Sequence, residues 1–313
     1  MKIIKPNRLR KGDLIGIISP ASSVEDKTQL EKGIKYIEGQ GYCVELGKNL
    51  GKERGYLAGT DEERVEDIHQ MFGDKNISAI FCLRGGYGAF RLLDRIDYQL
   101  IRKNPKIFVG FSEITSLQMA FLKKANLVTF AGPMIASHLS NEINSFTEEN
   151  FWRLLTSKRK PGKIVLSEKK NNSKVKNTNT SGRIIGGNLA VLTSMIGSGF
   201  LPAFKNNILL LEEIKEPPYK IDRMLNQLRL HNVFNKVNGI ILGNFIDCEE
   251  PDKKKSSLSL EEVLEDYFAE LKIPVIHSFP HGHSKNIITL SFGINVNLNI
   301  KKGKIEFLEN AVR

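Results

Sequence analysis

Ser112 is a candidate catalytic residue at the end of an expected strand. It follows the apolar run 106–111 and precedes a run of helical character. Ligands of open parallel sheets bind at the carboxyl ends of the strands. A serine there can be a nucleophile, because the free amides of Glu113 and Ile114 and the helix dipole stabilise an oxyanion. It can equally be a helix N-cap, and Ile114 replaces the second glycine of a G-x-S-x-G elbow.

A glycine-rich turn and a pair of acids follow two other expected strands. Gly85, Gly86 and Gly88 lie directly after the apolar run 77–82 and allow backbone amides to approach a ligand, although a plain glycine turn is the alternative. Their spacing fits neither a P-loop nor a dinucleotide fingerprint. Glu212 and Glu213 end the apolar run 207–211. Strand side chains alternate, so one of these acids is expected to face the site and the other to point away, unless both form a surface pair.

Three histidines, His277, His281 and His283, lie within seven residues of a late loop. Closely spaced imidazoles are typical of metal sites, but no Asp or Glu lies nearby in the sequence. A single functional histidine and solvated loop histidines are the alternatives. Together with Ser112 and the acid pair, one histidine completes the residues of a serine hydrolase in the order Ser, Glu, His.

The elements expected to position these residues alternate between strands and helices from residue 13 to about 135. Thr60 and Glu63 have the spacing of a capping box. Strands without polar alternation, joined by helices, indicate a parallel sheet covered on both faces. The expected strands are 13–20, 42–47, 77–82, 106–111 and 127–133, and the expected helices are 25–41, 60–74, 89–96 and 114–126.

A second α/β unit is expected after a polar connection. Residues 157–181 lose helical periodicity and gain Lys, Asn, Ser and Gly, with one short strand expected at 163–166. The end of the chain, 289–309, alternates with period two around a Lys-Gly turn, which predicts an antiparallel hairpin. We therefore expect a domain over 1–156, a linker over 157–181 and a domain over 182–313. The second unit begins at residue 182, with expected strands at 207–214 and 238–245 and expected helices at 219–232 and 259–271.

Composition indicates a folded protein and narrows its partners. The 313 residues are 41% hydrophobic and 26% charged, with a net charge of +11. The lysines are scattered without interleaved aromatics, which argues against nucleic acid and a membrane surface and leaves a solvated surface or an anionic small ligand. No apolar run approaches the roughly 18 residues of a membrane span. The three cysteines form no C-x-x-C pair, so we expect a reducing, cytoplasmic setting.

The motifs, taken in order, resemble the LD-carboxypeptidase family of serine peptidases, which includes muropeptide L,D-carboxypeptidases and microcin C self-immunity proteins. The resemblance implies that Ser112 is the nucleophile, Glu212 the triad acid and His283 the base, with the amides of Gly86 and Glu113 as the oxyanion hole. Glu113 and Glu213 stand where the family usually has Asp, so the choice of Glu212 over Glu213 depends on the alignment. The blocks that carry the resemblance are GDLIGIISPAS, RGGYGAFRLLDRID, VGFSEITSL, GRIIGGNLAVLTSMIGS, LLLEEIKEPPYKIDRMLNQL, GIILGNFIDC and FPHGHSKNIITLSFG.

The resemblance also implies a fold and a substrate. It predicts a flavodoxin-like or amidotransferase-like first domain, a smaller α/β domain with a mixed sheet, a site in the cleft between them and a homodimer without cofactor or metal. The implied reaction releases terminal D-alanine from a small anionic murein tetrapeptide in peptidoglycan recycling, with Arg84 as a candidate for gripping the terminal carboxylate. The alternatives are an immunity-type hydrolase of peptidyl or aminoacyl-nucleotide amides, a metal hydrolase built on the three histidines, and a non-catalytic ligand-binding module.

Overall fold

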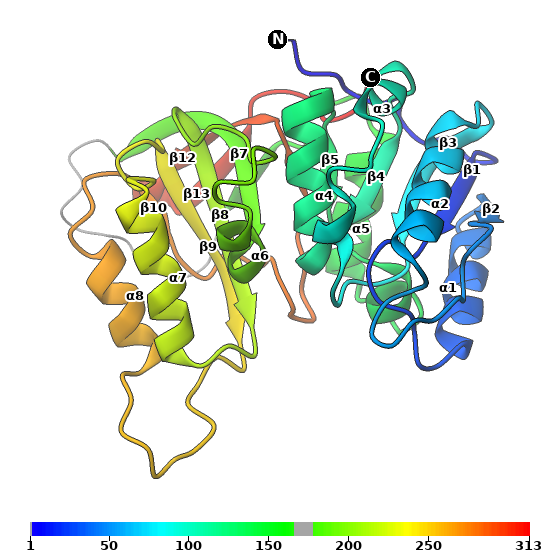
Figure 1. Ribbon diagram of the computed structural model, residues 1–313. Helices are drawn as coiled ribbons and strands as arrows, with labels where there is room; N and C mark the ends of the chain where they lie inside the picture. The colour runs from blue at the N-terminus through cyan, green and yellow to red at the C-terminus, as the bar shows by residue number, and fades with distance from the viewer. Residues whose placement is uncertain (1, 166–177) are drawn as a thin grey trace.

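The protein is built on two β-sheets that lie side by side, each with its own helices (Figure 1). The computed structural model describes residues 2–165 and 178–313. Within these residues, one sheet has six strands in the order β11-β5-β4-β3-β1-β2, and the other has seven in the order β10-β9-β8-β7-β12-β13-β6. The predicted fold class, α/β with a flavodoxin-like parallel sheet and a second, mixed sheet, is confirmed, and β11 adds an antiparallel edge to the first sheet that the prediction lacked.

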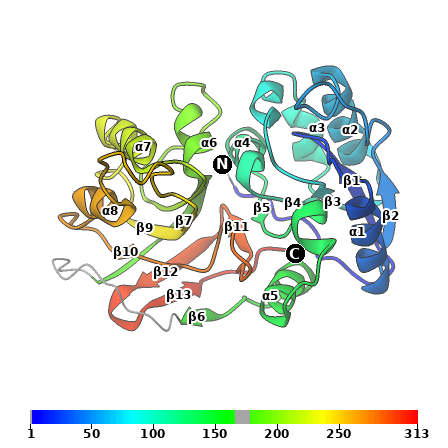
Figure 2. The same ribbon diagram turned by 90° about the horizontal axis from the view of Figure 1, so that it is seen from below.

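The first sheet has the strand order of flavodoxin. Five strands run parallel in the order β2-β1-β3-β4-β5, and β11 adds an antiparallel edge beside β5. Figure 2 shows α1 and α5 on one face and α2, α3 and α4 on the other. The elements are β1 (Leu14–Ile18), α1 (Thr28–Gly39), β2 (Cys43–Leu46), α2 (Asp61–Gly73), β3 (Ile77–Cys82), α3 (Tyr98–Lys103), β4 (Ile107–Gly110), α4 (Thr115–Ala120), β5 (Thr129–Ala131), α5 (Ser145–Thr156) and β11 (Leu290–Phe292).

Local sequence signals account for several boundaries in this domain. The predicted capping box is confirmed, because Glu63 donates its amide to the Thr60 side chain and the Thr60 amide donates to the Glu63 carboxylate. The predicted helix 89–96 is shorter, a 3₁₀ helix over Ala89–Leu92. The predicted helix 114–126 consists of α4 and a π turn, which ends where Asn126 adopts a left-handed φ of 56°.

The second sheet is mixed, as predicted. Its strands β7 to β10 run parallel, and β12, β13 and β6 add antiparallel pairs. Helix α7 contacts both α6 and α8, and the three helices lie together on one face of this sheet (Figures 1 and 2). The elements are β6 (Lys163–Val165), β7 (Asn179–Asn188), α6 (Leu189–Ser194), β8 (Asn207–Ile214), α7 (Pro218–Leu230), β9 (Gly239–Ile246), α8 (Leu260–Phe268), β10 (Val275–Ile276), β12 (Asn295–Asn299) and β13 (Lys304–Phe307).

The chain crosses between the sheets near its end. The predicted hairpin is confirmed for β12 and β13, but β11, inside the predicted segment 289–309, pairs with β5 of the first sheet instead. Gly293, with a φ of 90°, lies between β11 and β12, where the chain changes sheet. The predicted strand at 163–166 corresponds to β6, and β7 begins inside the predicted linker. Linker residues 166–177 lie outside the described residues, and the proposed domain limits stay a prediction.

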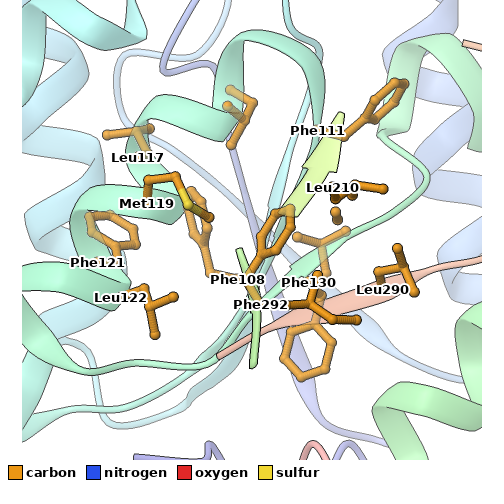
Figure 3. Packing of buried hydrophobic residues seen from close by; sticks show 14 of the residues in the cluster. Phe108, Phe111, Leu117, Met119, Phe121, Leu122, Phe130, Leu210, Leu290 and Phe292 are labelled. Atoms are coloured by element: carbon orange, nitrogen blue, oxygen red, sulfur yellow. The ribbon is translucent and has the colours of Figure 1, made fainter. Parts of the chain in front are cut away.

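Apolar side chains from both sheets form one continuous core. Figure 3 shows Phe108 and Phe130 of the first sheet, Leu210 of the second and Phe292 of β11 among the residues of this single buried cluster. All four side chains are fully buried. The Gly186 amide in β7 also contacts Met119 Sδ in α4 at 3.3 Å. The two domains therefore pack through a shared apolar interface, which fixes the ends of their strands relative to each other.

The described residues, 2–165 and 178–313, include no helix with the length and apolar character to cross a membrane. The two ends of the chain pair with each other. Arg313 donates its amide to the Pro6 carbonyl at 2.9 Å, and its own carbonyl accepts the Arg8 amide at 3.1 Å. The last residues thus return to the first domain after the hairpin of the second.

Candidate active site

Ser112 lies on a sharp turn directly after β4. Its φ of 63° is left-handed, which is uncommon for a residue other than glycine and marks local strain at functional turns. Gly110 permits the tight turn, because a Cβ at this position would lie 2.7 Å from the Ile114 side chain. A short 3₁₀ helix, Ser112–Ile114, then leads into α4. The segment therefore exposes the serine as a nucleophile elbow would, although Ile114 replaces the second glycine.

The alternative role of Ser112 as a helix cap is not what the structure shows. Phe111 occupies the N-cap position of the 3₁₀ helix, Ile114 that of α4, and neither helix has a side-chain capping bond. Ser112 is itself the first helical residue and is partly buried. The amide of the next residue, Glu113, belongs to the first turn, where helix amides lack acceptors.

The glycine-rich turn packs directly against Ser112. A Cβ on Gly85 would lie 3.3 Å from Ser112 Oγ and 3.6 Å from the Glu113 amide nitrogen. The turn is held from the side of β1 by Ser22, which donates its amide to the Gly85 carbonyl at 3.2 Å and accepts the Tyr87 amide at 3.0 Å. Gly86 has a φ of 104°, and a Cβ there would lie 2.4 Å from Ser22 Oγ. Only glycine fits this position without displacing Ser22.

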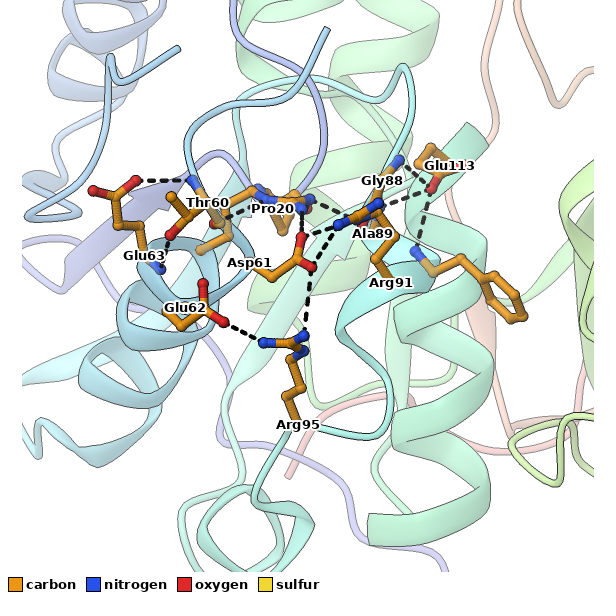
Figure 4. Close-up of polar contacts among 12 residues, drawn as sticks. Pro20, Thr60, Asp61, Glu62, Glu63, Gly88, Ala89, Arg91, Arg95 and Glu113 are labelled. Atoms are coloured by element: carbon orange, nitrogen blue, oxygen red, sulfur yellow. Dashed lines mark hydrogen bonds and ion pairs between the residues drawn. The ribbon is translucent and has the colours of Figure 1, made fainter. Parts of the chain in front are cut away.

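The Glu113 side chain contacts the backbone of residues 88–90, at the end of the glycine-rich turn. One of its oxygens, Oε1, accepts the amides of Gly88 and Ala89 at 2.8 Å each and that of Phe90 at 3.3 Å (Figure 4). Burial raises the pKa of this carboxyl, while the three amide donors act in the opposite direction. Sequence reasoning assigned Glu113 a backbone role only, and no sequence signal revealed these side-chain contacts.

Glu212 and His283 form a hydrogen-bonded acid and base. His283 Nδ1 lies 2.8 Å from Glu212 Oε2, and only 1% of the Glu212 side chain is exposed. A carboxylate at Nδ1 holds the proton on that nitrogen, so Nε2 is left to accept one. The His283 ring lies 4.9 Å from the ring of Phe111, the residue before Ser112. Ser112 Oγ and His283 share no direct hydrogen bond, and catalytic pairs often close this distance only with substrate bound.

The loop that carries His283 is anchored on the first domain. Asn144 Nδ2 donates to the Lys285 carbonyl at 2.6 Å, and the Ile287 amide donates to Thr147 Oγ1 at 3.0 Å. Asn144 and Thr147 belong to the start of α5, beside the first sheet. The loop also has to pass close to Glu212, and Gly282 permits this, because a Cβ there would lie 2.9 Å from Glu212 Oε2. The His283 imidazole is thus held by both domains.

Glu213 points away from His283, so the predicted alternation of the two acids is confirmed. It accepts Asn188 Nδ2 and the Ala190 amide at 2.8 Å each, and the Ile214 amide at 2.9 Å. Burial raises the pKa of this carboxyl to about 7, and the neighbouring Glu212 contributes in the same direction.

The three predicted histidines do not converge. His281 is buried, and its Nδ1 contacts the Ile288 carbonyl at 2.9 Å instead of facing His283. In the described part of the chain, no three His, Cys, Asp or Glu side chains are grouped as a metal site would require. Sequence reasoning missed His138, whose ring lies 5.3 Å from that of Phe111. Burial lowers the pKa of His138 to about 4, and His283 contributes.

Arg84 lies beside the glycine turn, as the sequence suggested. Its Nη1 donates to the Ser23 carbonyl at 3.0 Å, a contact that uses one of five guanidinium donors. Ser22 and Ser23 follow β1, and no site residue was predicted at the end of this strand. The rule that singled out the other strand ends would have found Ser22 at this one.

Comparisons with known proteins show the family of the chain. Family models described as the LD-carboxypeptidase N-terminal and C-terminal domains match residues 15–132 and 181–298. A probable murein peptide carboxypeptidase of Bacillus subtilis is 38% identical over 296 residues, 94% of this chain and 91% of the relative. A crystal structure of muramoyltetrapeptide carboxypeptidase from Oxalobacter formigenes has a TM-score of 0.83 at 32% identity, covering 94% of this chain and 97% of that chain. Microcin C7 self-immunity protein MccF in complex with aspartyl sulfamoyl adenosine has a TM-score of 0.89 at 27% identity, covering 99% and 100%. The chain therefore belongs to the LD-carboxypeptidase family of peptidases.

Proposed function

We propose that this protein is a serine-type L,D-carboxypeptidase that releases the terminal D-alanine of murein tetrapeptides in peptidoglycan recycling. The observation that carries the proposal is the 2.8 Å contact between Glu212 and His283, held beside the strained Ser112 turn. The murein peptide relatives support the choice of substrate.

The proposed reaction uses Ser112, His283 and Glu212 as a catalytic triad. His283 Nε2 takes the proton of Ser112 Oγ while the oxygen attacks the carbonyl carbon of the scissile amide. Glu212 stabilises the imidazolium that forms. His283 then gives the proton to the amine of the leaving D-alanine as the carbon–nitrogen bond breaks, and an acyl-enzyme remains. A water molecule, deprotonated by His283, hydrolyses this ester and restores Ser112.

The proposed oxyanion hole consists of the amides of Gly86 and Glu113. Among the described residues, the amides from Tyr87 to Phe90 already have acceptors in Ser22 and Glu113, whereas Gly86 donates to none. The Gly86 and Glu113 amides therefore remain to hold the oxygen that becomes negative in the tetrahedral intermediate.

Substrate recognition is proposed to use positive charge. The scissile bond precedes a terminal carboxylate, and Arg84 next to the glycine turn can bind it through guanidinium donors that Ser23 leaves unused. A small anionic peptide also suits the net charge of +11. We place the reaction in the cytoplasm, which suits three cysteines that are all unpaired, and we expect a homodimer as the family resemblance implies.

An immunity-type hydrolase of peptidyl or aminoacyl-nucleotide amides is the second candidate. It is favoured by the likeness to MccF in complex with aspartyl sulfamoyl adenosine. The same triad can attack either amide, so the two functions differ in the groups that bind outside the scissile bond. Parallel assays with a murein tetrapeptide and an aminoacyl sulfamoyl adenosine distinguish them by the ratio of kcat/KM values.

The triad is tested by Ser112→Ala. We expect D-alanine release to fall by about 10⁴-fold or more, with an unchanged melting temperature, because the substitution removes the attacking oxygen. A serine-reactive phosphonate should label the natural protein at Ser112 and leave the variant unlabelled. Retained turnover in the variant would remove Ser112 from the mechanism. Loss of activity with a chelator, or no labelling of the natural protein, would support the metal-hydrolase or non-catalytic alternative.

A further inference from the structure

We infer that the Glu113 side chain is a positioning residue that aligns the two amides of the oxyanion hole with each other. The inference rests on the proposed function, since it concerns how the Gly86 and Glu113 amides are held. Glu113 takes no part in the proposed triad. Its carboxylate is buried, and only 6% of the surface of the residue is exposed.

The first step is the contact between one oxygen and three successive amides. Gly88, Ala89 and Phe90 all donate to Glu113 Oε1. Successive backbone amides that converge in this way form a concave anion-binding turn. Here the anion belongs to the protein itself, and it comes from the residue directly after the proposed nucleophile. The carboxylate therefore fastens the segment after β3 to the turn after β4.

The second step is that the same segment is also held from its other side. Arg64 Nη1 donates to the carbonyls of Gly88 and Pro20 at 2.8 Å each, and Arg64 pairs with Asp61 (Figure 4). Gly88 has a φ of 106°, and a Cβ there would lie 2.3 Å from Leu57. Both the amide and the carbonyl of Gly88 are thus fixed, two residues after Gly86.

The third step concerns the distance between the two oxyanion donors. One donor is the amide of Glu113, and the other lies on Gly86. Ser22 holds the neighbours of Gly86, Gly85 and Tyr87, and Glu113 holds the same loop at Gly88, two residues after Gly86. The residue that provides one donor therefore also fixes the loop that provides the other. A displacement of about 1 Å in such a site can cost about 10²-fold in rate.

The role follows from the acceptor and not from the negative charge. A negative charge beside the hole would oppose the oxyanion, but its field is offset by three amide donors and by Arg64, which acts on the Glu113 carboxyl. Glutamine retains an oxygen acceptor of similar reach and removes the charge. Alanine removes the acceptor and leaves three amides without a partner. The two substitutions therefore separate positioning from charge.

The experiment compares Glu113→Ala and Glu113→Gln with a matched control in the same domain. The control is Asp67→Ala. Asp67, in α2, is also a buried carboxylate, and it accepts the backbone amide of Asn49, which lies in the loop after β2. Strand β2 lies at the sheet edge, three places from β4. Each variant is measured for kcat and KM of D-alanine release, for the rate of Ser112 phosphonylation, and for melting temperature.

We expect Glu113→Ala to lower kcat and the phosphonylation rate by about 10²-fold while KM stays within about 3-fold, as for loss of one oxyanion donor. Glu113→Gln should stay within about 10-fold in kcat. Asp67→Ala should lower the melting temperature and leave kcat within about 3-fold. A Glu113→Ala variant with no larger loss of kcat than the control, or with a loss in KM alone, would overturn the inference.

The remaining outcomes also decide. If Glu113→Ala does not fold, Glu113→Gln carries the test, and a 10²-fold loss of its kcat at unchanged KM would show that charge and not the acceptor matters. If Ser112→Ala retains turnover, the proposed function fails whatever Glu113 does. If Ser112→Ala is inactive and Glu113→Ala behaves like the control, only the positioning role fails.

Discussion

The ends of β4 and β8 repeat one arrangement in two different sheets. Each carries a pair of residues, Ser112-Glu113 and Glu212-Glu213, in which the first faces the candidate site and the second turns into the protein. Both second residues accept amides from the segment that follows the neighbouring strand. Glu113 reaches residues 88–90 after β3, and Glu213 reaches Ala190 after β7.

The two ends differ in how they present the first residue. Ser112 has a left-handed backbone and is partly buried, whereas Glu212 continues an extended strand and is almost fully buried. In the proposed mechanism Ser112 must reach substrate, and the sharp turn exposes it. Glu212, the proposed triad acid, acts through the imidazole of His283, and burial strengthens that contact because water no longer screens it. The two arrangements have in common a buried glutamate as the second residue of the pair, Glu113 or Glu213.

The largest effect should come from separating Glu212 from Glu213. We expect Glu212→Gln to lower kcat by about 10⁴-fold, because an amide at His283 Nδ1 no longer fixes the tautomer in which Nε2 accepts a proton. Glu213→Gln, on the adjacent residue, should stay within about 10-fold. The measurement is kcat for D-alanine release by both variants under the same conditions.

This pair also contains its own control. Both substitutions keep the side-chain volume and replace a buried carboxyl group at the end of β8 by an amide. Unequal losses therefore report the contact with His283 and not the loss of a buried carboxyl group in general. Equal losses in the two variants, or a larger loss for Glu213→Gln, would contradict the assignment of Glu212 as the triad acid.

Much of the framework follows from the sequence, because its signals are local. Unbroken apolar runs identified the parallel strands, and Thr60 with Glu63 identified the start of α2. The position of β11 did not follow. Residues 290–292 alternate as the rest of the hairpin does, and their partner is β5, some 160 residues earlier, which periodicity within a segment cannot indicate.

The site was predictable in part for the same reason. Strand ends identified Ser112, the glycine turn and the two acids, and alternation showed that the acids point in opposite directions. The contacts of the Glu113 side chain and the approach of His138 to Phe111 depend on how separate elements pack. Neither the type of these residues nor their spacing carries that information.

The raised pKa of Glu213 offers a second way to distinguish the ends. Its folded value is about 7, above the ordinary value of 4.5, so between these values the folded state binds more protons than the unfolded state. This contribution to stability is present below about pH 4.5 and is lost as the pH rises through 7. Over that range the free energy of unfolding of the natural protein should fall, relative to Glu213→Gln, by on the order of 3 kcal/mol.

Urea unfolding at pH 5 and pH 8.5 measures this difference. The comparison uses the change with pH and not the stability at one pH, because glutamine also places an NH₂ group near the Ala190 amide and destabilises the variant at every pH. Parallel pH profiles for the natural protein and the variant would show that Glu213 does not titrate in this range.

The smallest effect should come from the bond that joins the two ends. Thr115, three residues after Ser112, accepts the Asn188 amide at 3.2 Å, and Asn188 in turn donates its side chain to Glu213. Thr115→Val keeps the buried shape and leaves the Asn188 amide without an acceptor. We expect the free energy of unfolding to fall by about 1 kcal/mol, the lower end of the usual cost of an unsatisfied buried donor, because the bond is long. A loss of kcat with no loss of stability would mean that Thr115 acts on the nucleophile turn itself. The two strand ends would then be coupled parts of one site. The similar contacts of Glu113 and Glu213 would reflect that coupling instead of a separate anchoring role at each end.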